Sequence, residues 1–313
     1  MPPFMAKRST NMKHNYSTTL IKLLLLNFII VASISINTTL CKAYISQSEM
    51  IIGNITFGSS LSQVKELYGE PDKLEITYRT SGKGNVERVT YENKLNLIAI
   101  NNKIIACTVY SPYITTSYGI KVGDSINRLR HVYGKEDGYF GAVIRYNAIE
   151  DNNKNLNFGY INGTITSIGL NSKENGYIQQ DGVMPSNQLA LGGIRLTNTM
   201  ADVVKTYGLP KRYRDYTAIY GNGLEITYFE NIITSQICDI RVTENNGFAT
   251  PSGITVGMNE TIIKKLHSTP NMLRITQNEH VYTYFGSNND RLKYIQFTAK
   301  NGKVTKISLH WAD

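Results

Sequence analysis

Four segments of the chain share one pattern of hydrophobic and polar positions. Each opens with Ile-x-apolar-Gly or a close variant, continues with apolar residues at helical spacing, and closes near Tyr-Gly-x-Pro. The segments begin at Ile55, Ile120, Ile194 and Ile254. Apolar positions three and four residues apart predict one short amphipathic helix in each segment. The shared order and spacing indicate four tandem repeats.

Strand-like runs follow each predicted helix. In the last segment, alternating runs at 292–298 and 304–311 flank Asn301-Gly302, a dipeptide that favours a tight hairpin turn. The second segment has the same arrangement around Asn162-Gly163. Each repeat is therefore expected to be one helix followed by about three antiparallel strands. The predicted fold class is α+β, with tandem αβββ repeats and antiparallel sheets whose helices pack on one face.

The repeats are expected to work in pairs, because a unit of about 60 residues buries too little apolar surface alone. The longest gap between repeats, 171–191, contains Ser, Asn, Gly and Pro, which are typical of a linker. We therefore predict repeats one and two in residues 44–178, a linker at 179–190, and repeats three and four in residues 191–313.

The first 43 residues have the pattern of an export leader. Four basic residues and no acidic residue precede the apolar stretch Leu23–Ile36. This stretch has the length of a signal-peptide core and is shorter than the ~20 residues that span a bilayer. Small residues before a cleavage point after Ala43 favour a signal peptide, and an uncleaved N-terminal anchor is the alternative. The protein is thus expected to be exported, either extracellular or associated with the cell envelope.

The net charge of the chain is much smaller when the predicted leader is left out. The 313 residues carry a formal net charge of +9, but five of the 33 basic residues precede residue 44. The remaining 28 basic residues face 24 acidic ones, a net charge of +4. The dense cluster Lys211-Arg212-Tyr213-Arg214 is interpreted as a solvated strand end. The charge therefore gives no indication of nucleic-acid binding.

The repeated unit resembles that of a known fold. Gly119-Ile-Lys-Val-Gly-Asp-Ser125 and Gly253-Ile-Thr-Val-Gly-Met-Asn259 are its best matches. It is similar to the repeat of the β-lactamase-inhibitor-protein-like fold and of the small outer-membrane assembly lipoproteins, BamE (SmpA/OmlA). The resemblance implies a helix-backed antiparallel sheet whose open face binds a protein outside the cytoplasm. This chain departs from the pattern at Glu136 and His267-Ser268, and no inhibitory loop can be transferred to it.

No catalytic, cofactor-binding or metal motif stands out. The four histidines after the leader have no paired ligand spacing. They are His131, His267, His280 and His310. Cys107 and Cys238 are interpreted as buried apolar residues, with a disulfide between the two halves as the alternative. We therefore expect no enzyme activity, no cofactor and no metal.

Aromatic residues are the candidates for partner binding. The chain has 21 Tyr against 9 Phe and 1 Trp, and tyrosine gives a large contact area at low entropic cost. The candidates in predicted strands are Tyr78, Tyr91, Tyr146, Tyr228, Tyr282, Tyr284 and Trp311. The alternative is that these residues are ordinary strand residues on the helix-covered side.

The sequence thus predicts an exported, non-catalytic protein-binding module that acts at the cell envelope or outside the cell through open sheet faces. The expected partner is an extracytoplasmic protein, and membrane contact is expected only through an uncleaved N-terminal segment. The alternatives are a secreted hydrolase with an unrecognised site and a structural envelope spacer.

Overall fold

Antiparallel sheet dominates the structure, a computed structural model that describes residues 45–78, 84–173, 182–229 and 235–311. Within these ranges, sixteen strands form one sheet and four short α-helices accompany it. The helices are α2 (Leu61–Tyr68), α3 (Ile126–Tyr133), α4 (Met200–Tyr207) and α5 (Thr261–His267). The predicted leader, residues 1–43, lies outside the described ranges. The α+β class is confirmed in this general sense.

Each of the four helices is followed by four strands. Helix α2 precedes β1 (Lys73–Thr77), β2 (Val86–Tyr91), β3 (Leu95–Ile100) and β4 (Lys103–Val109). Helix α3 precedes β5 (Gly138–Phe140), β6 (Val143–Asn147), β7 (Lys154–Ile161) and β8 (Thr164–Ser172). Helix α4 precedes β9 (Arg212–Arg214), β10 (Thr217–Gly221), β11 (Leu224–Tyr228) and β12 (Ile237–Val242). Helix α5 precedes β13 (Met272–Thr276), β14 (His280–Phe285), β15 (Lys293–Lys300) and β16 (Lys303–Trp311). The expected three strands per helix were therefore one too few.

The helix ends follow from local sequence chemistry. The Ser60 hydroxyl accepts a hydrogen bond from the backbone N–H of Gln63 at 3.2 Å, which satisfies a free donor at the start of α2. At the other end, Gly69 has φ of 82°, a left-handed conformation that glycine adopts without steric cost. These residue choices stop the helix after two turns and lead the chain directly into β1.

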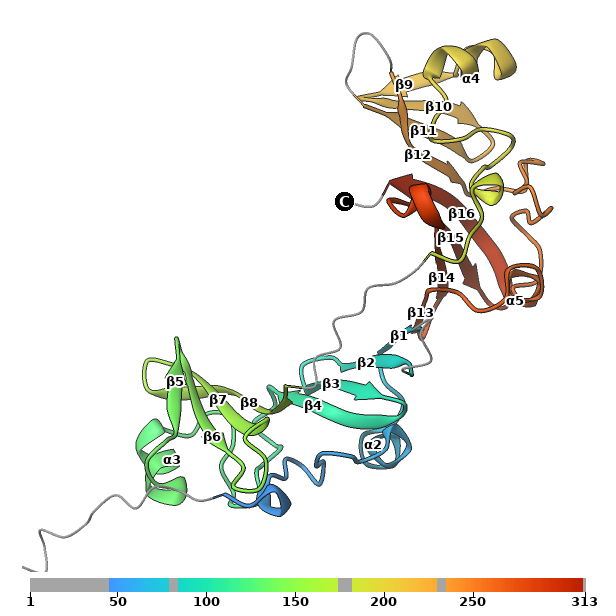
Figure 1. The fold of residues 1–313 in the computed structure, drawn as a ribbon. Helices are drawn as coiled ribbons and strands as arrows, with labels where there is room; N and C mark the ends of the chain where they lie inside the picture. Colours follow the sequence, from blue (N-terminus) through green and yellow to red (C-terminus); the bar gives the residue numbers. More distant parts are fainter. Residues whose placement is uncertain (1–44, 79–83, 174–181, 230–234, 312–313) are drawn as a thin grey trace, which may run out of the picture.

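The strand order divides the sheet into two halves that meet at its centre. In the first half β4 pairs with β8, and in the second half β12 pairs with β16. The halves are joined by antiparallel pairing of β1 with β13, from Lys73 opposite Thr276 to Thr77 opposite Met272. Strands β5 and β9 are the two ends of the sheet (Figure 1).

Two hydrophobic clusters form the core, one within residues 45–170 and the other within 184–309. In β3, for example, Leu95, Leu97 and Ala99 are buried on one side of the sheet, as period-2 alternation requires. Met184 and Leu189 lie within the predicted linker 179–190, yet both belong to the second cluster. The described part of that segment is thus packed against the second half and is not a free linker.

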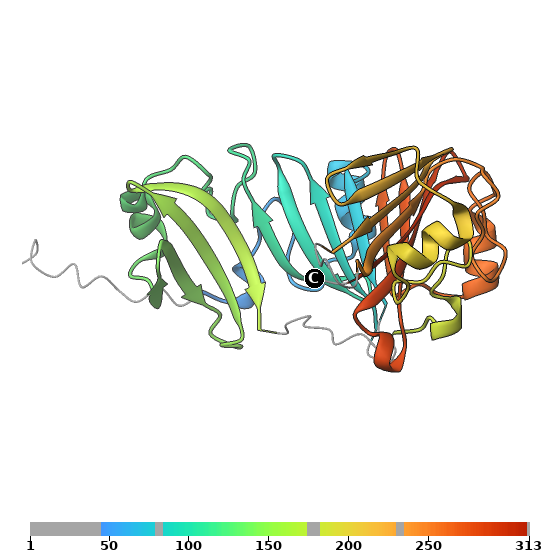
Figure 2. The ribbon, with the colours of Figure 1, turned by 90° about the horizontal axis from the view of Figure 1, so that it is seen from above.

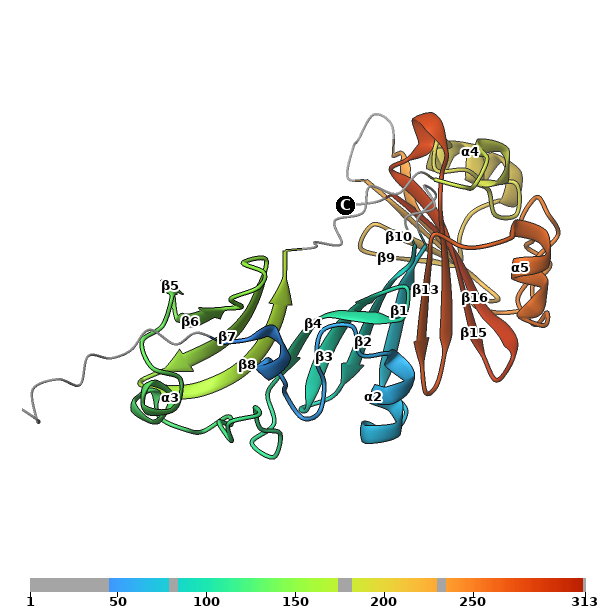
Figure 3. The same cartoon turned by 60° about the horizontal axis from the view of Figure 1, so that its bottom comes forward.

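The helices lie on one side of the sheet. Figures 2 and 3 show α2 and α3 behind or below the strands of the first half, and α4 and α5 on the outer side of the second half. The sheet bends between the halves, and the helix-free sides of both halves face into the bend. Among the described residues, no helix has the length and apolar character needed to span a membrane.

Candidate functional site

The seven aromatic residues predicted for an open binding face pack against the cores instead. Tyr91 and Tyr146 belong to the first cluster, Tyr282 and Tyr284 to the second. Tyr78, Tyr228 and Trp311 are partly buried against the second cluster. Strand alternation turns these rings toward the helix-covered side, which favours the alternative interpretation that they are ordinary strand residues.

In all four groups a strand tyrosine ties a strand to the end of the preceding helix, and three of the four tyrosines are buried. The hydroxyl donates to the carbonyl of the C-cap residue, which directly follows the last residue of the helix. The pairs are Tyr91 to Gly69 (2.9 Å), Tyr146 to Gly134 (3.0 Å), Tyr220 to Gly208 (3.2 Å) and Tyr284 to Ser268 (3.0 Å). Burial raises the pKa of Tyr91 to about 12, so its hydroxyl stays protonated and remains a donor at neutral pH.

A different row of side chains crosses the helix-free side of the second half. Phe285, Tyr294, His310 and Asp239 are register partners on the neighbouring strands β14, β15, β16 and β12. The Phe285 and Tyr294 ring centroids are 5.6 Å apart, and the Tyr294 ring stacks on His310 at 4.9 Å. His310 Nδ1 contacts the Asp239 carboxylate. All four residues are partly buried, with 20% of the His310 side chain and 17% of the Asp239 side chain exposed, so part of the row can be reached by another molecule.

Charged side chains of both signs extend this row toward β11. Arg241 Nη1 lies 3.6 Å from Glu225 Oε2, and Arg241 Nη2 lies 3.9 Å from Asp239 Oδ1. Partly exposed ion pairs of this kind add little to stability. Aromatic rings beside a guanidinium group are typical of protein-binding surfaces. We call Phe285, Tyr294, His310, Asp239 and Arg241 the open-face row.

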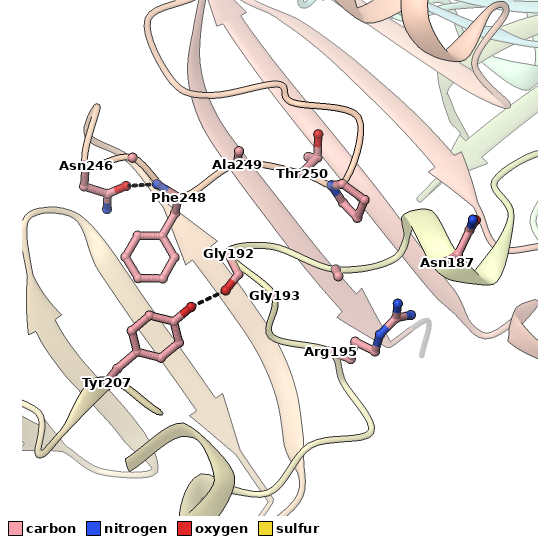
Figure 4. A pocket seen from close by; sticks show the side chains of 12 residues that line it. Asn187, Gly192, Gly193, Arg195, Tyr207, Asn246, Phe248, Ala249 and Thr250 are labelled. Carbon is pink, nitrogen blue, oxygen red and sulfur yellow. Dashed lines mark hydrogen bonds between the residues drawn. The ribbon is translucent and has the colours of Figure 1, made fainter. Parts of the chain in front are cut away.

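A hollow of about 590 Å³ opens beside α4 in the second half (Figure 4). The turn Gly192-Gly193 forms one wall, and the Tyr207 hydroxyl donates to the Gly192 carbonyl. The Tyr207 and Phe248 rings lie 5.2 Å apart, and Asn246 Oδ1 accepts a hydrogen bond from the Phe248 N–H at 3.0 Å. Figure 4 shows Tyr207 and Phe248 side by side at the turn.

The first half has a hollow of about 490 Å³ with the same construction. Here the turn is Gly53-Asn54, and the Tyr68 hydroxyl donates to the Gly53 carbonyl at 2.8 Å. The backbone N–H of Gly53 donates to Thr115 O at 2.8 Å, just as that of Gly192 donates to Ala249 O at 2.8 Å. Among the described residues, neither hollow has a lining Asp, Glu, His or Cys. The lining of the hollows therefore offers no carboxylate, imidazole or thiol for acid–base chemistry, and the hollow beside α4 is lined by the Arg195 guanidinium.

Replacing Gly192 by alanine is expected to destabilise the protein more than replacing Gly193. Both glycines have positive φ, 60° and 78°, so both alanines carry the same kind of backbone strain. A Cβ on Gly192 would lie 2.0 Å from Phe248 Cδ1, whereas a Cβ on Gly193 meets nothing closer than 4.0 Å. Overpacking of this kind adds about 1–3 kcal/mol, measurable as the difference between the two urea unfolding free energies. Equal losses would contradict the packing described for the hollow.

The histidines and cysteines named in the sequence analysis lie apart from one another in the structure. His267 ends α5 where the other helices end in tyrosine; its Nε2 lies 2.9 Å from Ser252 Oγ, and burial lowers its pKa. His280 Nδ1 lies 3.0 Å from Glu260 Oε2, and His131 is exposed on α3. Across the described ranges, no three His, Cys, Asp or Glu side chains gather as metal ligands.

Among the described residues, Cys107 and Cys238 are free thiols, and they lie in different halves of the structure. Cys107 is buried in β4, where burial raises its pKa to about 12 and keeps the thiol protonated. Cys238 is only half-buried in β12, and burial also raises its pKa. The interpretation as a buried apolar residue therefore fits Cys107 better than Cys238.

Comparisons with known proteins give three structural similarities. No family profile and no curated protein sequence matches the chain. A DUF4309 family protein from Bacillus subtilis aligns over 36% of this chain and 78% of its own, with 14% identity and a TM-score of 0.25. An extracellular protein containing an SCP domain from Bacillus anthracis aligns over 38% and 44%, with 10% identity and a TM-score of 0.27. A proposed beta-lactamase inhibitor protein from Streptococcus mutans aligns over 42% and 92%, with 14% identity and a TM-score of 0.19.

Proposed function

We propose that the protein is an exported, non-catalytic protein-binding module that contacts its partner through the open-face row. The protein acts at the cell envelope or outside the cell. The observation that carries this proposal is the row itself, in which stacked rings, a His–Asp pair and a guanidinium group line up across adjacent strands. The basic and apolar pattern of residues 1–43 supports export.

The module is, in this proposal, built from four tandem copies of one helix-and-strand unit. Two features support this: the order of one helix and four strands recurs four times, and each copy has a strand tyrosine bonded to its helix end. One face of each unit is used to build the core. The other face is thereby left free to diverge between units, as the open-face row on the second half illustrates.

The row suits a protein partner that presents both charges and apolar side chains. Phe285 and Tyr294 offer ring surface for apolar contacts, and aromatic anchors dominate the energy of many interfaces. Arg241 can donate to carboxylates, while Asp239 and Glu225 can accept from a basic side chain. A row of side chains across neighbouring strands matches an extended area of protein better than a small molecule, which prefers an enclosed apolar pocket.

Affinity capture with matched variants tests this proposal. Residues 44–313 would be immobilised as wild type, as Tyr294→Ser, as Arg241→Glu, and as the control Tyr113→Ser. Tyr113 is 92% exposed in the first half and lies beside the hollow of that half. The amount of captured partner is expected to fall at least tenfold with both open-face variants and to stay unchanged with the control. The circular dichroism spectra of all three variants are expected to match that of the wild type. Retention by the open-face variants, or loss with all three, would reject the open-face row as the binding surface.

A further inference from the structure

The two end strands of the sheet are positional counterparts of the two strands that meet at its centre. Strands β1, β5, β9 and β13 each begin four residues after the C-cap residue of the preceding helix. Strands β1 and β9 belong to the first group of their halves, whereas β5 and β13 belong to the second. The central joint therefore pairs a first-group strand with a second-group strand. The free ends, β9 and β5, offer the same combination.

One chain cannot make this second pairing with itself. Strands β5 and β9 lie at opposite ends of the sixteen-stranded sheet, with fourteen strands between them (Figure 1). They can meet only if one chain presents β9 and another presents β5. We propose that the protein assembles head to tail, with β9 of one copy pairing antiparallel with β5 of the next copy.

The central joint supplies the register for this contact. It places the third residue of β1, Glu75, opposite the third residue of β13, Arg274. The same register places Arg214, the third residue of β9, opposite Phe140, the third residue of β5 in the second copy, and this is the one pair in which both residues lie within the end strands. An arginine over a phenylalanine ring is a favourable cation–π pair. The side chain of Arg214 is 63% exposed and lies 4.0 Å from Glu225, so it is available for this contact.

Exposed aromatic rings lie on both end strands. Strand β5 exposes Tyr139 by 54% and Phe140 by 76%, and β9 exposes Tyr213 by 54%. Both strands have only three residues, and β9 also carries Arg212 and Arg214, features that limit uncontrolled pairing at a sheet edge. Contact with a second copy would cover part of the exposed ring surface. It would also give the cluster Lys211-Arg212-Tyr213-Arg214 a role beyond that of a solvated strand end.

The geometry predicts an open assembly. Each copy would use one end of its sheet and leave the opposite end free, so the contact is heterologous and continues into a filament or closes into a ring. In the register of the central joint the end strands share one residue pair, against five pairs in that joint. The contact between copies is therefore weaker than the joint within a copy, and the assembly is expected to grow with protein concentration.

Sedimentation velocity of residues 44–313 over a hundredfold concentration range tests the proposal. The weight-average mass is expected to rise beyond that of a dimer without a plateau. Phe140→Lys and Arg214→Glu should each weaken association at least tenfold, the first because it places Lys opposite Arg214. The double variant Phe140→Lys with Arg214→Glu should restore association, because the two new charges attract. Tyr113→Lys is the control and should assemble as the wild type does.

Three outcomes would overturn the proposal. One is a wild-type chain that stays monomeric at every concentration. Another is a dimer that forms a plateau, which would indicate a symmetric contact. The third is assembly that neither single variant changes, or that the double variant does not restore, while circular dichroism shows all variants folded.

Discussion

Replacing Glu75 by proline is expected to lower the free energy of unfolding by about 1–3 kcal/mol, the cost of leaving a ladder carbonyl without its donor. Glu75 lies at the middle of β1, opposite Arg88 of β2 on one side and Arg274 of β13 on the other. Proline has no N–H to donate, and it is found in sheets essentially on edge strands or at bulges. The substitution therefore removes a ladder bond from a strand that is paired on both sides.

The same substitution should loosen the contact between the two halves. Leu74 packs against the first cluster, whereas Tyr78, just after β1, packs against the second, so β1 serves both cores. Urea unfolding followed by circular dichroism measures the loss of stability, and small-angle X-ray scattering should show a larger radius of gyration. Arg212→Pro, at the first position of end strand β9, is the matched control and should cost clearly less. Equal costs would show that the β1–β13 joint does not hold the halves together.

Replacing Tyr146 by alanine is expected to cost about 3–5 kcal/mol, as large-to-small changes of buried aromatic residues do. Tyr146 is fully buried, and its ring lies 5.4 Å from Tyr133 and 5.9 Å from Phe158. Its hydroxyl also donates to the Gly134 carbonyl at 3.0 Å. Alanine removes the ring, the aromatic contacts and this hydrogen bond together.

A graded series separates these contributions. Tyr146→Phe keeps the ring and loses only the hydrogen bond, so about 1 kcal/mol is expected. Tyr113→Ala removes a ring that is 92% exposed and should change stability by no more than about 0.5 kcal/mol. Urea unfolding free energies of the three variants provide the measurement. A Tyr146→Ala variant as stable as Tyr113→Ala would contradict the buried position of Tyr146.

The sequence predicted the helices and the longer strands because their signals are local. Alternation around Asn301-Gly302 predicted the hairpin of β15 and β16, which pair along nearly their full length. The strand β5 was missed because Gly138–Phe140 is too short to show alternation. The β1–β13 joint was missed for another reason, since the local residue pattern of a strand does not indicate which distant strand pairs with it.

The candidate site shows the limit of composition as a guide. Tyrosine abundance drew attention to Tyr282 and Tyr284, which face the core. Strict alternation in β14 would have placed Phe285 on the opposite side from Tyr284 and indicated the open-face row. The contacts of that row with His310 and Asp239 depend on the order of β15, β16 and β12 in the sheet. That order is a long-range property, and residue patterns alone do not contain it.

The β1–β13 joint also has a consequence for how the chain reaches its native state. It pairs residues about 200 positions apart, a separation of the kind that slows folding through the entropy of loop closure. Each half has its own hydrophobic cluster, so each can condense before the joint forms. A chain made from its N-terminus completes β1 long before β13 exists. During that interval β1 is paired with β2 on one edge only, and closure of the joint covers the other edge and ends this period of vulnerability to aggregation.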